Sequence, residues 1–149
     1  MKERYWTTPM ESESGRRIMV TGRDHMEKIM EKGKHPNLIR VSWRYNQGAD
    51  GFPDAIDSKL MEEASDLLEE TFRKDPVAYL VAITTGDGER EWLFYAGSLP
   101  IFGKVFNRAL EGMEETLPLE ITAESDPEWE AYKEIREATY IPESPEETE

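Results

Sequence analysis

The fold is decided by the stretch VAYLVAITTGDGEREWLFYAG, residues 77–97, which is typical of two β-strands joined by a tight turn. Residues 77–85 and 89–97 are rich in β-branched and aromatic side chains, which favour strands. Between them stands Gly86-Asp87-Gly88, and an Asp-Gly pair is a strong signal for a two-residue hairpin turn. We therefore expect an antiparallel hairpin here.

One amphipathic helix is expected on each side of this hairpin. Before it, residues 58–74 carry apolar side chains at helical spacing on one face and acidic side chains on the other. After it, Ser98 and Pro100 open a second helix with a wide apolar stripe, and Gly112 ends it. Strands are expected at residues 38–46 and 117–123, because polar and apolar side chains alternate there.

The resulting order from residue 38 to residue 123 is β-α-β-β-α-β. This is the split βαβ arrangement of ferredoxin-like folds, with an antiparallel sheet and both helices on one face. The sequence thus predicts an α+β fold in one domain, residues 1–141, with its core at about residues 38–123.

Additional elements are expected on both sides of this core. A hairpin of residues 3–8 and 16–21 comes first, followed by a short helix that Asp24 caps and Gly33 ends. A C-terminal helix is expected to begin at Asp126-Pro127-Glu128, with the acid as its cap and proline in its first turn. Residues 142–149 are acidic and interrupted by proline, which predicts a disordered tail.

The charge of the chain is strongly negative and unevenly distributed. The formal net charge of the 149 residues is -14. Residues 1–56 carry 10 Lys and Arg against 8 Asp and Glu, and residues 57–149 carry 8 against 24, so the whole negative excess lies in the second part. Such a chain is repelled by phosphate backbones, so we expect no direct binding to nucleic acid. It is expected to attract basic partners.

The composition also bears on the compartment. Cysteine is absent, which fits a reducing compartment and excludes disulfides, thiolate metal sites and a cysteine nucleophile. No stretch approaches the roughly 18 apolar residues of a membrane-spanning helix, and the N-terminus has no apolar run typical of a secretory signal. We expect a cytoplasmic protein that does not enter the membrane.

Known catalytic patterns are missing. His25 and His35 are the only histidines, and their spacing fits no zinc motif. The Gly86–Gly88 loop joins two strands, whereas a phosphate-binding loop leads into a helix. No Gly-x-Ser-x-Gly elbow exposes a serine nucleophile. The sequence therefore predicts no catalytic residue, no metal and no cofactor, and it favours a protein that is not an enzyme.

Two groups of side chains are candidates for a binding site. On the strand of residues 38–46, Arg40, Ser42 and Arg44 form the outward face, and Arg90 begins a neighbouring strand. These arginines are expected either to bind an anion or acidic peptide, or to pair with the protein's own acids; the N-terminal hairpin or a second subunit is an alternative cover for this face. Most of the aromatic residues are expected in the core. Among them the tyrosines are better site candidates, because each hydroxyl needs a partner: Tyr45, Tyr95 and Tyr132.

Four stretches, read in order, resemble the DUF695 family, a bacterial domain family of unknown function. They are residues 40–45 (RVSWRY), 51–53 (GFP), 84–95 (TTGDGEREWLFY) and 126–132 (DPEWEAY). The resemblance covers residues 38 to about 136, and the N-terminal hairpin and helix look like the extension of a longer subgroup. The family implies no activity. A looser likeness in fold and charge to the regulator of ribonuclease E activity B, an acidic protein inhibitor, implies protein binding.

The sequence favours a non-enzymatic protein-interaction or regulatory module, with a basic or RNA-binding protein as its partner. The alternative is a domain that binds a small molecule or anion, or an unrecognised enzyme, using the arginines and tyrosines named above. A homodimer through the open face of the sheet is compatible with either hypothesis.

Overall fold

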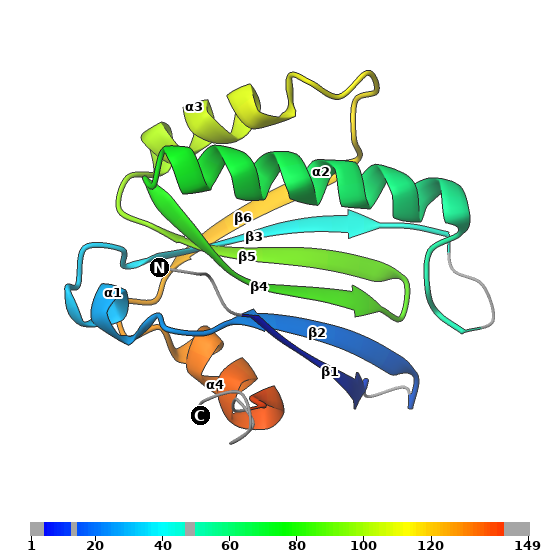
Figure 1. Ribbon diagram of the computed structural model, residues 1–149, viewed down its shortest axis with the longest axis horizontal. Coiled ribbons are helices and arrows are strands. Elements are labelled where there is room, and N and C mark those ends of the chain that lie inside the picture. Colours follow the sequence, from blue (N-terminus) through cyan, green and yellow to red (C-terminus); the bar gives the residue numbers. More distant parts are fainter. Residues whose placement is uncertain (1–4, 13–14, 47–49, 142–149) are drawn as a thin grey trace, which may run out of the picture.

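The structure is a computed structural model that describes residues 5–12, 15–46 and 50–141. The expected tail at residues 142–149 lies outside the described residues. Within them the chain is α+β, with one six-stranded antiparallel sheet and four helices (Figure 1). In chain order the elements are β1 Tyr5–Glu11, β2 Arg17–Arg23, α1 Glu27–Glu31, β3 Asn37–Arg44, α2 Ala55–Lys74, β4 Ala78–Gly86, β5 Glu89–Ala96, α3 Leu99–Leu110, β6 Leu119–Ser125 and α4 Glu130–Thr139.

The β4–β5 hairpin confirms the expectation from its turn sequence. Gly86 pairs with Glu89, and the two residues between them, Asp87 and Gly88, have φ angles of 52° and 88°. Two consecutive positive φ angles match the twist of the flanking strands, and Asp-Gly tolerates them. The hairpin lies inside the sheet, whose order is β1-β2-β4-β5-β3-β6.

The N-terminal hairpin enlarges the sheet instead of covering it. β1 and β2 pair with each other, as expected, and β2 also pairs with β4. The sheet therefore has six strands, with β1 and β6 at its two edges (Figure 1). The alternative that this hairpin lies over the arginine-bearing face is wrong, because its backbone extends the edge of β4.

Helices α2 and α3 cover one face of the sheet, where the larger hydrophobic core forms. Both helices have side-chain caps: Asp54 accepts a hydrogen bond from the Asp57 amide, and Ser98 from the Ile101 amide. The Asp54 cap explains why α2 begins at Ala55, three residues before the expected start.

A second, smaller core lies on the opposite face of the sheet. Helix α4 packs on this face (Figure 1). The side chains of this core come from both ends of the chain and from the middle of the sheet: Trp6, Met26, Leu38, Val81, Ala82, Leu93, Tyr95, Trp129 and Tyr132. Trp6 fits over Gly22, its partner across the β1–β2 pair. Helices thus lie on both faces, and only part of the second face stays open.

Two helix starts differ from the sequence expectation. Helix α4 begins at Glu130 and not at Asp126, because Trp129 adopts a left-handed backbone with φ of 56°. Asp126 still caps the helix, since its carboxylate accepts bonds from the Glu130 and Ala131 amides. Helix α1 begins after Met26 without a side-chain cap, and Asp24 accepts instead from the neighbouring His25 amide.

Candidate functional site

The six candidate residues lie on two opposite faces of the sheet. Arg90 stands directly across from Trp43 in the β3–β5 register, so it shares the face that α2 covers. The outward-facing Arg44 stands across from Glu89 instead. The expectation that Arg40, Arg44 and Arg90 line one face is therefore wrong, because Arg90 has the opposite phase along its strand.

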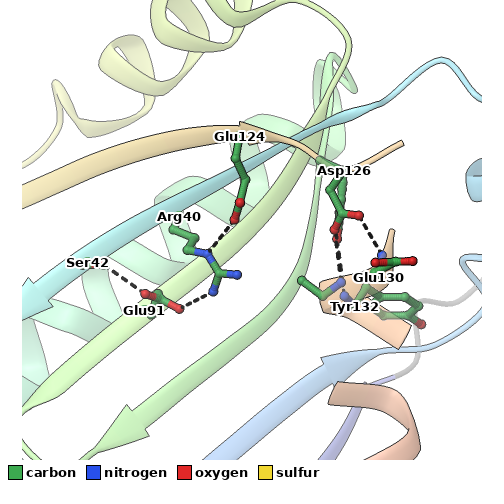
Figure 2. A network of polar contacts seen from close by, with 9 residues as sticks. Arg40, Ser42, Glu91, Glu124, Asp126, Glu130 and Tyr132 are labelled. Atoms are coloured by element: carbon green, nitrogen blue, oxygen red, sulfur yellow. Dashed lines mark hydrogen bonds and ion pairs between the residues drawn. The ribbon is translucent and has the colours of Figure 1, made fainter. Parts of the chain in front are cut away.

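The sheet face that carries Arg40 holds a network of internal ion pairs (Figure 2). Arg40 Nη1 lies 3.3 Å from Glu91 Oε1, and Arg40 Nε lies 3.5 Å from Glu124 Oε1. The Ser42 hydroxyl donates to the other oxygen of Glu91 at 3.1 Å. Of the two interpretations weighed for these arginines, pairing with the protein's own acids is the one that this geometry matches.

Arg44 extends the same face but is far more exposed. Its Nε lies 3.6 Å from Glu89 Oε2, and 85% of its side chain is accessible to solvent. An ion pair so open to water contributes little to stability. Arg44 is thus the most available cation of this face among the predicted site residues.

Tyr95 and Tyr132 belong to the second core and use their hydroxyl groups inside the protein. The Tyr95 hydroxyl donates to Asp126 Oδ2 at 2.6 Å and accepts from the Tyr132 amide at 3.3 Å. The Tyr132 hydroxyl donates to the Arg23 carbonyl at 2.6 Å. Burial raises the pKa of both tyrosines. These hydroxyls fasten α4 to the sheet.

Asp126 places a negative charge where α4 meets the sheet. Burial opposes its ionisation, but hydrogen bonds from the Tyr95 hydroxyl and from the Ala131 and Glu130 amides outweigh the effect and lower the pKa of its carboxyl. The carboxylate therefore stays ionised at the start of α4, where the helix dipole favours negative charge.

Tyr45 lies on the face of α2 and organises the loop before that helix. Its hydroxyl donates to the Gly51 carbonyl at 2.8 Å, and its amide donates to the Gly88 carbonyl at 3.0 Å. The Gly88 amide in turn donates to the Gly51 carbonyl at 3.0 Å. These bonds join the loop at Gly51 to the turn of the β4–β5 hairpin, and Phe52 and Pro53 follow directly.

Arg90 lines a pocket of about 300 Å³ between α2 and the sheet. Its Nη1 donates to the Thr85 hydroxyl and its Nη2 to the Ser65 hydroxyl, both at 2.9 Å. The Arg90 Cζ atom lies over the Trp92 ring, 5.1 Å from its centroid, and the Trp92 indole N–H also donates to Ser65. Burial lowers the pKa of Arg90, while the charges of Glu62 and Glu69 oppose that shift.

Ser65 was not among the site residues predicted from the sequence. It follows Met61 by four residues and is buried on the apolar face of α2. A serine within the apolar stripe of a predicted helix could have indicated such a residue, because a buried hydroxyl needs a hydrogen-bond partner. The Ser65 hydroxyl oxygen accepts hydrogen bonds from both Arg90 Nη2 and the Trp92 indole N–H.

A second hollow lies beside the edge strand β6. It has a volume of about 430 Å³ and is lined by apolar side chains of α3, β6 and the segment between them, with glutamates around it. On β6 itself, Ile121 belongs to this lining and is 48% exposed. This edge was not among the sites predicted from the sequence.

The described residues 5–12, 15–46 and 50–141 contain no cluster of three or more histidine and carboxylate side chains that could hold a metal ion. None of the helices among them has the length and apolar character needed to cross a bilayer.

Comparison with known proteins gives one match. A model of the DUF695 family, described as a family of unknown function, matches residues 4–135. No curated protein and no solved structure matches the chain. Because the match starts at residue 4, it includes the N-terminal hairpin, which had looked like the extension of a subgroup. The match runs from the first strand into the last helix, and the chain therefore belongs to the DUF695 family.

Proposed function

We propose that this domain is a non-enzymatic protein-interaction or regulatory module that binds an extended basic segment of a partner along β6. The observation that carries the proposal is the open edge of the sheet. Among the described strands β6 pairs only with β3, and residues 120–125 are all exposed. The outward N–H and C=O groups of an edge strand can pair with an added strand from a partner.

The side chains of β6 define what such a partner strand carries. Glu120, Thr122 and Glu124 stand across from Ser42, Arg40 and Leu38, so they lie on the face of the ion-pair network. Ile121 stands across from Val41 and lies on the opposite face, beside the 430 Å³ hollow. A strand that alternates basic and apolar side chains matches both faces of this edge.

The charge of the molecule supports a basic partner over a second copy of the chain. Residues 57–149, which include β6, carry the whole negative excess. Glutamates on an edge strand oppose pairing with an identical strand, since like charges would then lie close together. The same charges speed the approach of a cationic segment.

We also propose that the unit from β3 to β6 is ferredoxin-like. The order β4-β5-β3-β6, with every neighbouring pair antiparallel, supports it, as does the position of α2 and α3 on one face. A basic or RNA-binding protein then remains the partner class we favour, in line with the looser likeness to the regulator of ribonuclease E activity B. A cytoplasmic location, which the absence of cysteine favours, is part of this proposal.

The test uses the full chain and a labelled seven-residue peptide of alternating lysine and valine, with fluorescence anisotropy at low and moderate salt. The double variant E120K/E124K is expected to weaken binding at least tenfold. The control, E134K/E137K, makes the same charge change on exposed residues of α4 and is expected to lose much less.

Hydrogen exchange on the same complex distinguishes strand addition from loose charge attraction. The bound peptide is expected to slow exchange at residues 119–125 more than at β1, the other edge. Equal loss of binding in both double variants, or unchanged exchange at β6, would refute the proposal.

A homodimer through the sheet remains a separate prediction. The part of the second face not covered by α4 carries Arg40, Ser42 and Glu91, which already bond to one another. Sedimentation velocity decides the matter: a monomer at all concentrations up to the millimolar range would exclude the dimer.

A further inference from the structure

We infer that the Arg90 pocket binds the carboxylate of a small monoanionic molecule with an apolar body. This site lies on the α2 side of the sheet and does not depend on the partner strand proposed for β6. The alternative function predicted from the sequence was anion binding by the arginines. The site inferred here differs from it in location, because Arg90 is its cation and Arg40 and Arg44 take no part.

The first reason is that the charge of Arg90 lacks a direct counter-ion. Arg40 and Arg44 each have a carboxylate within 4 Å. Arg90 has none among the residues that the structure describes, and Glu62 and Glu69 act on it only from farther away. A guanidinium removed from water is costly unless its charge is matched, so an anion entering the pocket would supply the missing partner.

The second reason is that its donors are fixed in position but incompletely used. A guanidinium has five N–H groups, and two of them donate to Thr85 and Ser65. The buried Nε has no hydrogen-bond partner within the described part of the chain. The Arg90 Cζ atom lies over the Trp92 ring, 5.1 Å from its centroid, which favours this position of the cation. A carboxylate accepts two parallel N–H bonds from such a group, which makes it the matching ligand group.

The third reason is the chemistry of the pocket walls. β2, α2, β4 and the loop before α2 supply both apolar side chains and hydroxyl groups: Met19, Thr21, Phe52, Ser58, Met61 and Ile83. A volume of about 300 Å³ is at the lower end of ligand pockets, so the ligand is small. Glu62 is also part of the lining and disfavours a second negative charge on the ligand.

The loop that closes the pocket is held by the backbone bonds described above. Tyr45 and Gly88 both bind the carbonyl of Gly51, next to Phe52. The pocket wall formed by Phe52 and Pro53 is therefore tied to the same hairpin that carries Arg90. The site is built from elements that pair with one another, which preserves its shape before any ligand arrives.

The experiment titrates the full chain with hexanoate in a buffer without phosphate, sulfate or other carboxylates. NMR signals of the Trp92 indole N–H and the Met19 and Met61 methyl groups are followed. Hexanoate is expected to shift them saturably, 1-hexanol at equal concentration not at all, and the dianion adipate is expected to bind at least threefold more weakly.

Variants connect these shifts to the pocket. Arg90→Met is expected to weaken hexanoate binding at least tenfold. Ser58→Leu fills the pocket without touching the guanidinium and is expected to do the same, which keeps the test valid if the Arg90 variant folds poorly. Arg44→Met, on the opposite face, is expected to leave binding unchanged. Hexanoate shifts that survive Ser58→Leu, or the absence of saturable shifts in the unaltered protein, would overturn the inference.

Discussion

At the scale of single residues, Tyr95 and Asp126 connect the last helix to the sheet. The Tyr95 side chain is fully buried, its ring stacks on Trp129 at 4.2 Å between centroids, and its hydroxyl bridges Asp126 and the Tyr132 amide. A tyrosine singled out as a possible ligand contact is thus a structural residue. The reason is that both hydrogen-bonding roles of its hydroxyl are filled from within the chain.

Tyr95→Phe is expected to lower the free energy of unfolding by about 1–3 kcal/mol, because it removes one of the hydrogen bonds to Asp126 and takes away the acceptor of the buried Tyr132 amide. Urea unfolding followed by tryptophan fluorescence measures the change. Tyr79→Phe is the control, since the Tyr79 hydroxyl makes no hydrogen bond within the described residues, and its effect is expected to stay below about 0.5 kcal/mol. Similar losses in both variants would contradict this role for Tyr95.

The lowered pKa of Asp126 predicts a loss of stability in acid. Its folded pKa lies below the unfolded value of about 3.9, so the ionised carboxylate stabilises the fold above that pH. This contribution disappears as the pH falls through the folded pKa. Asp126→Asn is expected to be less stable at neutral pH and to show a smaller further loss between about pH 5 and pH 2. If the free energies of unfolding of the two proteins fell in parallel as the pH is lowered, this stabilising role of the Asp126 carboxylate would be disproved.

At the scale of elements, local signals predicted most of the fold. Helix α2 and the β4–β5 hairpin could be found because helical periodicity and an Asp-Gly turn act within a few residues. The start of α4 could not, since the left-handed backbone of Trp129 accompanies a long-range stack on Tyr95. A local capping pattern therefore located the helix but not its first residue.

The difference between local and long-range signals also explains which of the candidate arginines were placed on the correct face. Strand β3 alternates clearly, so its outward residues Arg40 and Arg44 were identified correctly. On β5 both faces carry large apolar side chains, so its pattern does not reveal which face Arg90 takes. Its phase comes from the register with β3, which puts Arg90 across from Trp43. This register depends on how β3 and β5, which are far apart in the chain, pair with each other. The residues around Arg90 alone do not reveal it.

The contact between β1 and β2 gives a prediction at this scale. A Cβ atom on Gly22 would lie 2.1 Å from Cζ2 of Trp6, so Gly22→Ala must displace the indole from the second core. We expect a loss of about 1–3 kcal/mol, measured by thermal unfolding. Gly103→Ala in α3 is the control: nothing lies within 4 Å of its new methyl group, and alanine favours the helix by about 1 kcal/mol. A neutral Gly22→Ala would show that Trp6 is not confined there.

At the scale of the whole molecule, the net charge of -14 is the dominant property. Exposed ion pairs such as Arg44–Glu89 and Lys74–Glu70 contribute little individually, so repulsion among the remaining acids prevails. The charge that attracts a basic partner also weakens the compact state.

Sodium chloride is therefore expected to raise the free energy of unfolding between about 0.02 and 0.5 M, because salt screens the repulsion. Urea unfolding at each concentration measures the trend. The variant E134K/E137K, which reduces the negative charge by four units, is expected to respond less. A decline with salt in the unaltered protein would mean that attractive pairs outweigh the repulsion.

The division of the second core between the two ends of the chain matters during synthesis. Strands β3, β4 and β5 are complete once residue 96 has been made, yet Trp129 and Tyr132 belong to a later segment. At about 5–20 residues per second, a nascent chain spends several seconds with Leu38, Leu93 and Tyr95 uncovered. During that interval the apolar face is exposed to solvent and prone to aggregation, until α4 is made and covers it.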